Sequence, residues 1–432
     1  MDSSHAGLRF ARISARRVWG SLWFVPSLYV VGALALSVGL VRWDDADPIQ
    51  LGRAIDESSA TAALSALGSG MLAFTGFVTS VILMLVQFGS SQFSPRFVAR
   101  FRRSRTLMFA LSTFSATFLF ALVSTAQIGR GDATFVPTRT LIAALLLTLL
   151  SILMFLLLIN STSNELRVAR VVQMVDKLAR DVFDTIYPAS ASGAAAEQEV
   201  AHALAGRTPV QTVRLGPVGR VVVAIDQGGI ANLARKHDAV VELVPAIGDH
   251  VPGGGKLLNV YGAQVLPERR LRRYVAMGDE RTLDDDPAFA IRMLVDVAIK
   301  ALSPAINDPT TAVQSLDRIE DLLRYAAAKH LSVGVVADAD GTSRLVFPTP
   351  TWDDLVHLAL DEIRAFGAGQ YQVARRMRAL LDDLINDLPV GRRAVLQRQS
   401  DLLNDAVTSA ITSGQRADAL VADRQGIGMA QR

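Results

Sequence analysis

The segment Leu141–Ile159 reads LIAALLLTLLSILMFLLLI and carries no charged side chain. An α-helix rises about 1.5 Å per residue, so a run of this length spans roughly the 30 Å hydrocarbon core of a bilayer. Lipid offers the backbone no hydrogen-bonding partners, and a helix satisfies its own backbone internally. The segment therefore predicts a transmembrane helix.

Three comparable runs precede this one, at residues 18–41, 60–88 and 106–128. Residues 160–432 contain no further run of this kind. The sequence thus predicts a transmembrane domain of four helices over residues 1–160, followed by an α+β cytosolic domain. The first run could also be read as a signal peptide ending near Ala33-Leu34-Ala35, but it stays apolar to Val41, longer than a typical signal-peptide core.

The distribution of arginine and lysine predicts the orientation in the membrane. Arginines 9, 12, 16 and 17 precede the first run, and the connection at residues 96–105 is the most basic short loop of the chain. An excess of Lys and Arg marks the cytoplasmic side. We expect a multi-pass protein of a bacterial plasma membrane, with both termini and residues 160–432 cytoplasmic, and with basic residues near anionic headgroups.

Composition removes several classes of function. The chain has no cysteine, which excludes disulfides and thiolate chemistry, and its net charge of +3 is uninformative as a total. No charged residue lies deep in a run, which argues against a proton-relay transporter. No zinc-protease, nucleophile-elbow, Walker or nucleic-acid motif is present, so we expect no enzyme, metal site, cofactor or nucleic-acid partner.

The second run carries a stripe of small and polar residues. Its members are Ser65, Ser69, Gly76, Ser80, Gln87 and Ser91. Their alternating steps of four and seven residues give eleven residues per three turns, which places all of them on one helix face. Two interpretations stay open: close packing against another helix, or the polar wall of a pore formed by several subunits of a homo-oligomer.

The cytosolic part divides by pattern into successive pieces. Residues 161–196 predict a connecting helix and a soft linker. Residues 197–280 shift toward a period of two and predict a β-rich subdomain with a small β-barrel-like part. Residues 281–420 predict a mainly helical subdomain with one hairpin at 333–347, and residues 421–432 a flexible tail.

A glycine-rich turn at residues 248–255 reads GDHVPGGG. Its order resembles the hairpin of small lipoyl- or biotinyl-type barrels, but no lysine stands in a matching attachment turn. The glycines could also cradle a phosphate, yet no Gly-Lys-Ser/Thr follows them. We interpret the segment as a plain turn.

A second turn interrupts a helical pattern and contains Ser303, Pro304, Asn307, Asp308 and Pro309. Proline suits the first position of a helix and aspartate suits the N-cap, so a structural turn is predicted. The alternative is that Asp308 faces a cation or Arg292. The run Asp284-Asp285-Asp286 similarly predicts helix N-terminal charge in preference to a calcium site.

Two long motifs resemble a known family. They are VQFGSSQFSPR at residues 86–96 and FAIRMLVDVAIKALSPAINDPTTA at residues 289–312. Both are similar to signatures of the bacterial membrane proteins grouped as domain of unknown function 2254, and the likeness spans roughly residues 15–410. The resemblance implies an integral membrane protein and brings no settled activity with it.

The first motif lies where the second run leaves the membrane. Gln92, Ser94 and Arg96 could contact a phosphate headgroup or an anion at a pore mouth. The alternative is a helix end satisfied by its own polar side chains. For the whole chain two functions remain open: an oligomeric channel or transporter with a cytosolic regulatory domain, or a non-conducting sensor, scaffold or regulator.

Overall fold

The computed structural model describes residues 24–47, 57–92, 105–128, 137–165, 168–187, 204, 206–283, 286–331, 334–338 and 340–428. The chain divides into two compact units. One holds residues 15–167, and the other holds the chain from Val168 onward.

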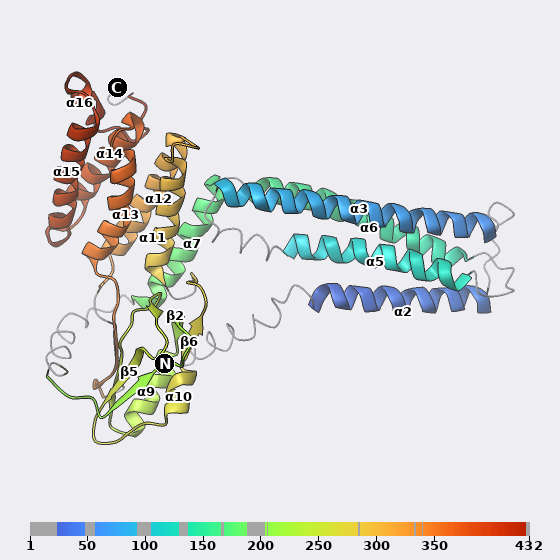
Figure 1. Ribbon diagram of the computed structural model, residues 1–432, viewed down its shortest axis with the longest axis horizontal. Coiled ribbons are helices and arrows are strands. Elements are labelled where there is room, and N and C mark those ends of the chain that lie inside the picture. Colours follow the sequence, from blue (N-terminus) through green and yellow to red (C-terminus); the bar gives the residue numbers. More distant parts are fainter. Residues whose placement is uncertain are drawn as a thin grey trace. The chain divides into compact units, whose positions relative to one another are not determined.

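The first unit is a bundle of four long helices that run alongside one another (Figure 1). They are α2 (Phe24–Ala46), α3 (Glu57–Gln92), α5 (Arg105–Ile128) and α6 (Thr138–Glu165). Each is long and apolar enough to cross a membrane. The four predicted runs are therefore present as four helices, and α3 continues beyond its predicted end at residue 88.

Helix α5 lies at the centre of this bundle. Within its most apolar stretch 44% of residues are buried, against 22% or less for the other three helices. It contacts α2, α3 and α6, and the rings of Phe114 and Phe120 are fully buried. The third span is thus the helix on which the other three pack.

Polar groups inside the bundle find partners on neighbouring helices. Ser37 Oγ lies 2.8 Å from Ser124 Oγ, and Thr117 Oγ1 lies 2.9 Å from Ser151 Oγ. Asp44, fully buried at the end of α2, accepts the backbone N–H of Thr140 at 2.9 Å. These contacts hold the helices in register, because an unpaired polar group in a dry interior is costly.

The second unit combines a β-rich part with a helical part. Its strands are β1 (Gln211–Arg214), β2 (Arg220–Ile225), β3 (Val240–Leu243), β4 (His250–Val251), β5 (Lys256–Tyr261), β6 (Val275–Gly278), β7 (Gly334–Ala337) and β8 (Ser343–Phe347). Its helices are α7 (Val168–Ile186), α9 (Gln227–Lys236), α10 (Glu268–Arg273), α11 (Pro287–Ala301), α12 (Pro309–Ala327), α13 (Trp352–Gly367), α14 (Tyr371–Asp387), α15 (Val390–Ala410) and α16 (Arg416–Ala419), with a 3₁₀ turn η2 (Ser413–Gln415).

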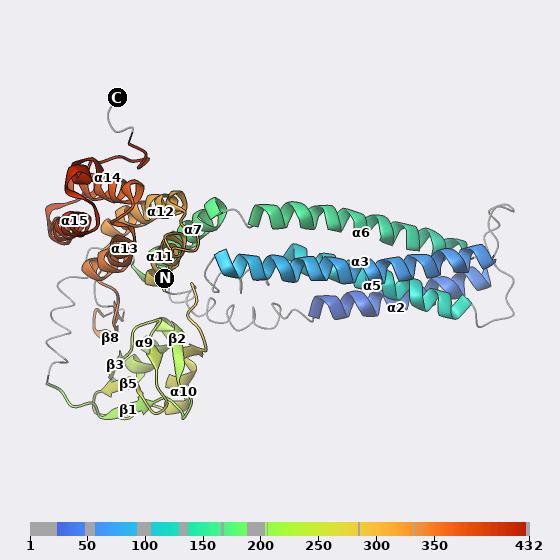
Figure 2. The same cartoon turned by 45° about the horizontal axis from the view of Figure 1, so that its top comes forward.

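The strands form two separate sheets, of order β1-β5-β3-β8-β7 and β4-β2-β6. Figure 2 shows β1, β5, β3 and β8 in succession. Among the described residues these strands do not close into a barrel, so the barrel-like prediction is not confirmed. The hairpin of β7 and β8 completes the larger sheet instead, because β8 pairs in parallel with β3.

The helical part is built around α11, whose residues are buried along most of its length. Helices α7, α12 and α13 contact it, and α14 and α15 extend the layer. Phe183 of α7 and Tyr187, the residue after this helix, are buried in this packing. Helix α7 therefore belongs to the core of the second unit, although it follows the fourth span after only two residues.

Candidate functional site

The α3 stripe lies on the face of the helix that the chain leaves uncovered. Ser65, Ser69, Gly76, Ser80 and Gln87 are all exposed; the side chain of Ser91 lies outside the described residues. The opposite face is buried through Leu64, Met71, Val78 and Ile82. A Cβ added at Gly76 would meet no atom within 4 Å. Within one chain the stripe therefore packs against no other helix.

The serine hydroxyls of the stripe are satisfied by their own helix. Ser69 Oγ donates to the carbonyl of Ser65 at 2.9 Å, and Ser80 Oγ donates to the carbonyl of Gly76 at 3.0 Å. Such back-bonding lets a hydroxyl sit in lipid or at a helix contact without water. The structure locates the stripe but leaves both of its interpretations open.

The predicted headgroup contact falls largely outside the described residues. Gln92 is the last residue of α3, and nothing is described of its side chain or of Ser94 and Arg96. The prediction for these three residues stays a prediction.

The turn between α11 and α12 has the geometry of a helix cap. Asp308 Oδ1 accepts the backbone N–H of Thr311 at 3.1 Å, with Pro309 at the first turn of α12. Asn307 takes a positive φ of 48°, and Ser303 Oγ donates to the carbonyl of Lys300. Pro304 lies within the same turn. Arg292 does not bind Asp308; it pairs with Asp296 and Glu362.

The acidic run ends in a second cap. Asp286 is buried, accepts the N–H of Phe289 at 3.0 Å and binds Arg281 at 2.7 Å. Burial raises the pKa of this carboxyl, while the charge and hydrogen bonds of Arg281 oppose the rise. The neighbouring Gly248 has φ of +96°, and a Cβ there would collide with Asp286. The glycine-rich turn therefore supports this cap.

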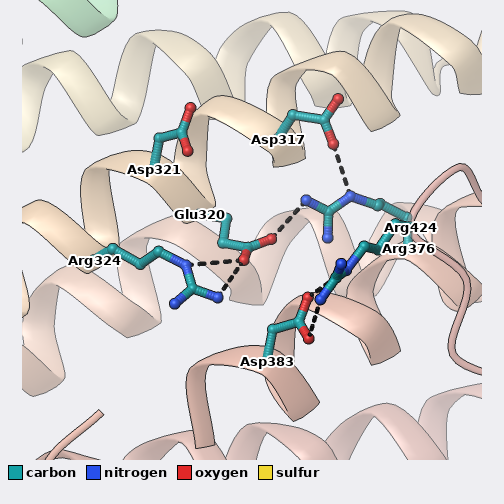
Figure 3. A pocket seen from close by; sticks show the side chains of 7 residues that line it. All are labelled: Asp317, Glu320, Asp321, Arg324, Arg376, Asp383 and Arg424. Carbon is teal, nitrogen blue, oxygen red and sulfur yellow. Dashed lines mark hydrogen bonds and ion pairs between the residues drawn. The ribbon is translucent and has the colours of Figure 1, made fainter. Parts of the chain in front are cut away.

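A polar pocket on the helical part brings together charged side chains from three segments of the chain, and the sequence pattern alone did not predict it as a site. Its volume is about 310 Å³, and it is lined by Asp317, Glu320, Asp321, Arg324, Arg376, Asp383 and Arg424 (Figure 3). The first four lie on α12, the next two on α14, and Arg424 on the segment after α16. Helices α12 and α14 contact each other, and Leu316 and Leu380 on them are fully buried.

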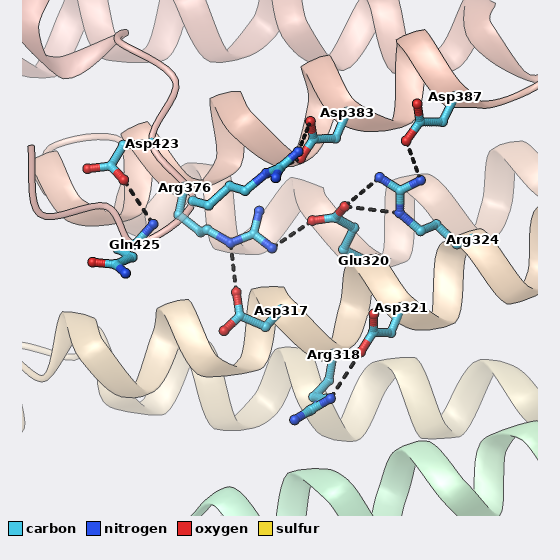
Figure 4. A network of polar contacts seen from close by, with 11 residues as sticks. Asp317, Arg318, Glu320, Asp321, Arg324, Arg376, Asp383, Asp387, Asp423 and Gln425 are labelled. Atoms are coloured by element: carbon cyan, nitrogen blue, oxygen red, sulfur yellow. Dashed lines mark hydrogen bonds and ion pairs between the residues drawn. The ribbon is translucent and has the colours of Figure 1, made fainter. Parts of the chain in front are cut away.

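Glu320 joins two arginines at the centre of the pocket. Its Oε1 accepts from Arg324 Nη2 at 2.8 Å, and its Oε2 accepts from Arg376 Nη2 at 2.6 Å (Figure 4). Arg324 also reaches Asp387 at 2.7 Å. Burial lowers the pKa of Arg324, but its bonds to Glu320 and Asp387 outweigh this and raise the pKa overall.

Arg376 is the unusual member of the set. Arg376 is only 4% exposed, and its Nε donates to Asp317 Oδ1 at 2.7 Å. Its Nη1 is buried and has no hydrogen-bond partner; among the described side chains only Thr282 Oγ1 shares that condition. A buried donor without a partner is rare in native structures and calls for an explanation.

Arg424 closes one side of the pocket. Its Nε and Nη2 donate to the two oxygens of Asp383 at 2.9 and 3.0 Å, which is a bidentate pair. The hydrogen bond to Asp383 raises the pKa of Arg424. The segment is anchored nearby, because Asp423 accepts the N–H groups of Gln425 and Gly428.

The α12 residues of the pocket form a pattern that is visible in the sequence. Asp317, Glu320, Asp321 and Arg324 recur at helical spacing on α12, but such a row ordinarily forms a solvated face with intrahelical pairs. The partners on α14 and after α16 lie more than 50 residues away. Across the described ranges no group of three His, Asp or Glu side chains is placed to hold a metal ion.

The fold and site define a class: a membrane protein with four candidate spans joined to a region of mixed helices and sheets. Residues 19–383 match the family described as predicted membrane protein, domain of unknown function 2254, and the chain belongs to that family.

The relatives include an uncharacterised protein of Mycobacterium bovis and one of Mycobacterium tuberculosis strain H37Rv. Each is 27% identical over 401 residues, covering 89% of this chain and 75% of the relative. No solved structure matches the chain.

Proposed function

We propose that the protein is an oligomeric channel or transporter whose subunits bring their α3 stripes to a shared axis, with the cytosolic unit as its regulatory domain. One observation carries the proposal. The small and polar face of α3 is exposed, whereas the buried polar groups Ser37, Thr117 and Ser124 have partners within the chain.

Either lipid or a second subunit covers this face of α3. Lipid tails form no favourable polar contacts with serine, glycine or glutamine, and burying the Gln87 amide in hydrocarbon without a hydrogen-bond partner is costly. A second copy of α3 could approach closely over such small residues. If several copies meet, the serines and Gln87 would surround a polar path.

A non-conducting sensor or regulator is the second candidate. The observation that favours it is the back-bonding of Ser69 and Ser80, because hydroxyls bound to their own backbone need no water. In that case the stripe is a dry contact between subunits.

Cysteine scanning separates the two candidates, because the chain has no cysteine of its own. Ser69→Cys and Ser80→Cys place thiols on the stripe. Val81→Cys is the matched control: it lies at the same depth, is 37% exposed, and points about 100° away around the helix.

In membrane vesicles, we expect both stripe thiols to form intersubunit disulfides under oxidation and to react with a membrane-impermeant thiol reagent, while Val81→Cys does neither. In liposomes, modification of Ser80→Cys should block ion flux. Cross-linking without reagent access or flux would support the sensor. Absence of cross-linking at both stripe positions would overturn the assembly through α3.

A further inference from the structure

Three arginines meet around the polar pocket, and one of them is held in an unusual way. Carboxylates occupy two nitrogens of Arg376: Asp317 binds its Nε and Glu320 binds its Nη2. These two bonds fix the plane of the guanidinium. The third nitrogen, Nη1, is buried and has no partner.

The free nitrogen faces the pocket. Figure 3 and Figure 4 both show it directed away from Asp317 and toward the side where Asp383 lies. Arg376 is among the residues that line the space. A donor that two carboxylates orient toward a cavity, and that has no acceptor within the described chain, is arranged to receive an acceptor from outside the chain.

Arg424 offers the second donor. It binds Asp383 through Nε and Nη2, and its Nη1 makes no hydrogen bond to another described residue. Its side chain is 79% exposed, on the short segment that follows α16. This arginine can therefore move between Asp383 and a ligand at little cost, unlike the buried Arg376.

We propose that this pocket binds a small oxyanion, the carboxylate or phosphate group of a soluble ligand, between Arg376 Nη1 and Arg424. A planar guanidinium matches the geometry of such groups and can bind them through parallel hydrogen bonds. The proposal does not depend on whether α3 lines a pore, because it concerns binding by the cytosolic unit alone.

The charge of the side chains that line the pocket limits which ligands can bind. Four carboxylates and three guanidiniums surround the space, so it carries one excess negative charge. This excess charge opposes anion binding, and it opposes a multiply charged oxyanion more strongly than a singly charged one, so the affinity has to come from the direct contacts with Arg376 and Arg424. A metal cation is disfavoured, because Asp317, Glu320 and Asp383 each already hold an arginine.

Thermal unfolding of the full chain in detergent tests the proposal. The probes are sodium formate, sodium acetate and inorganic phosphate, each compared with sodium chloride at equal ionic strength. A ligand that binds only the folded state raises Tm with concentration. We expect a saturable rise of about 2–4 °C, with the formate, acetate and phosphate arms showing which oxyanion is preferred.

Variants assign the effect to the two arginines. Arg424→Gln should raise the concentration for half-maximal stabilisation about tenfold, by removal of one charge-assisted contact. Arg376→Lys keeps the charge but loses the fork and should abolish the effect. Arg398→Gln, which removes an exposed pair with Asp353, is the control and should behave like the natural chain.

Two results would overturn the proposal. One is that no oxyanion stabilises the protein beyond chloride, in which case water alone satisfies Arg376. The other is stabilisation that persists equally in Arg424→Gln and Arg376→Lys, which would place the anion elsewhere. If Arg376→Lys fails to fold, Arg424→Gln still decides between these outcomes.

Discussion

Asp361 on α13 shows how one carboxylate ties two helices together. Its Oδ1 accepts from Gln399 Nε2 of α15 at 2.8 Å, and its Oδ2 lies 3.1 Å from His357 Nδ1. Burial raises the pKa of Asp361, but the bonds from Gln399 and His357, with the charge of Arg364, outweigh burial and lower the pKa overall.

A lowered pKa in the folded state predicts a definite pH dependence. The stabilisation is present above the unfolded pKa of about 3.9 and is lost as the pH falls through the lower folded value. Asp361→Asn should therefore lower the free energy of unfolding by about 1 kcal/mol at pH 7. The effect is small because the carboxylate is partly exposed and solvent weakens its interactions. Urea unfolding followed at Trp352 should show the difference from the natural chain shrinking toward pH 3. A difference that grows in acid would contradict this account.

Asp44 is the corresponding residue in the membrane unit. It is fully buried and accepts from the backbone N–H of Arg139 and Thr140 and from Thr140 Oγ1. The carboxylate of α2 thus caps the start of α6, where the first N–H groups of a helix lack partners. It fastens the first span to the fourth.

Removing this carboxylate should loosen that end of the bundle. Asp44→Ala removes the acceptor of the backbone N–H groups of Arg139 and Thr140 and of the Thr140 hydroxyl, while the Arg139 guanidinium keeps its ion pair with Asp47. We expect a loss of about 3 kcal/mol in the free energy of unfolding. Asp45→Ala is the matched control, because the side chain of Asp45, the next residue in the chain, is exposed. Thermal unfolding in detergent measures both. Equal Tm values for the two variants would show that the cap contributes nothing.

At the scale of elements, α3 makes the clearest prediction. Gly76→Leu puts a bulky side chain on the exposed stripe, where it meets nothing within one chain. The subunit should keep its fold, while a neighbouring helix would be forced away. Light scattering in detergent should report a smaller oligomer than for the natural chain. Val81→Leu lies off the stripe and should leave the assembly unchanged.

If Gly76→Leu keeps the assembly intact, the stripe faces lipid and not a second subunit. If the isolated subunit fails to fold, the substitution disturbs the packing of the four helices within one subunit.

The elements differ in how far sequence alone can predict them. The four spans were predictable because hydrophobicity over some 20 residues is a local property, and the cap at Asp308 follows from adjacent residues. The parallel pairing of β3 with β8 was not, because it joins Val241 to Leu345 across the intervening helices. The pocket was missed for the same reason: Arg376 and Glu320 belong to different helices, and nothing local indicates that they meet.

At the scale of the whole molecule, the second unit should begin at α7, before the linker predicted at residues 189–196. Phe183 of α7 and the following Tyr187 are buried, and Asp184 binds Tyr325 and Lys329. A fragment of residues 168–428 should unfold cooperatively in urea. A fragment starting at residue 197 exposes the apolar surface of α11 and α12 that α7 covers, and should lose several kcal/mol.

Circular dichroism and limited proteolysis would compare the two fragments. If they resist protease equally, α7 is a connector that merely lies against the core. If neither folds, the cytosolic unit needs the membrane helices or a second subunit.

The β3–β8 pairing also has a consequence for the order of events on the ribosome. Val241 meets Leu345, so one edge of β3 has to wait for about 100 further residues to be synthesised. At roughly 5–20 residues per second this delay is about 5–20 s. During that interval the nascent chain presents an unpaired strand edge, the kind of edge that promotes aggregation. Arrest of translation between β3 and β7 should therefore yield a species that recruits chaperones, and release should follow once β8 has emerged.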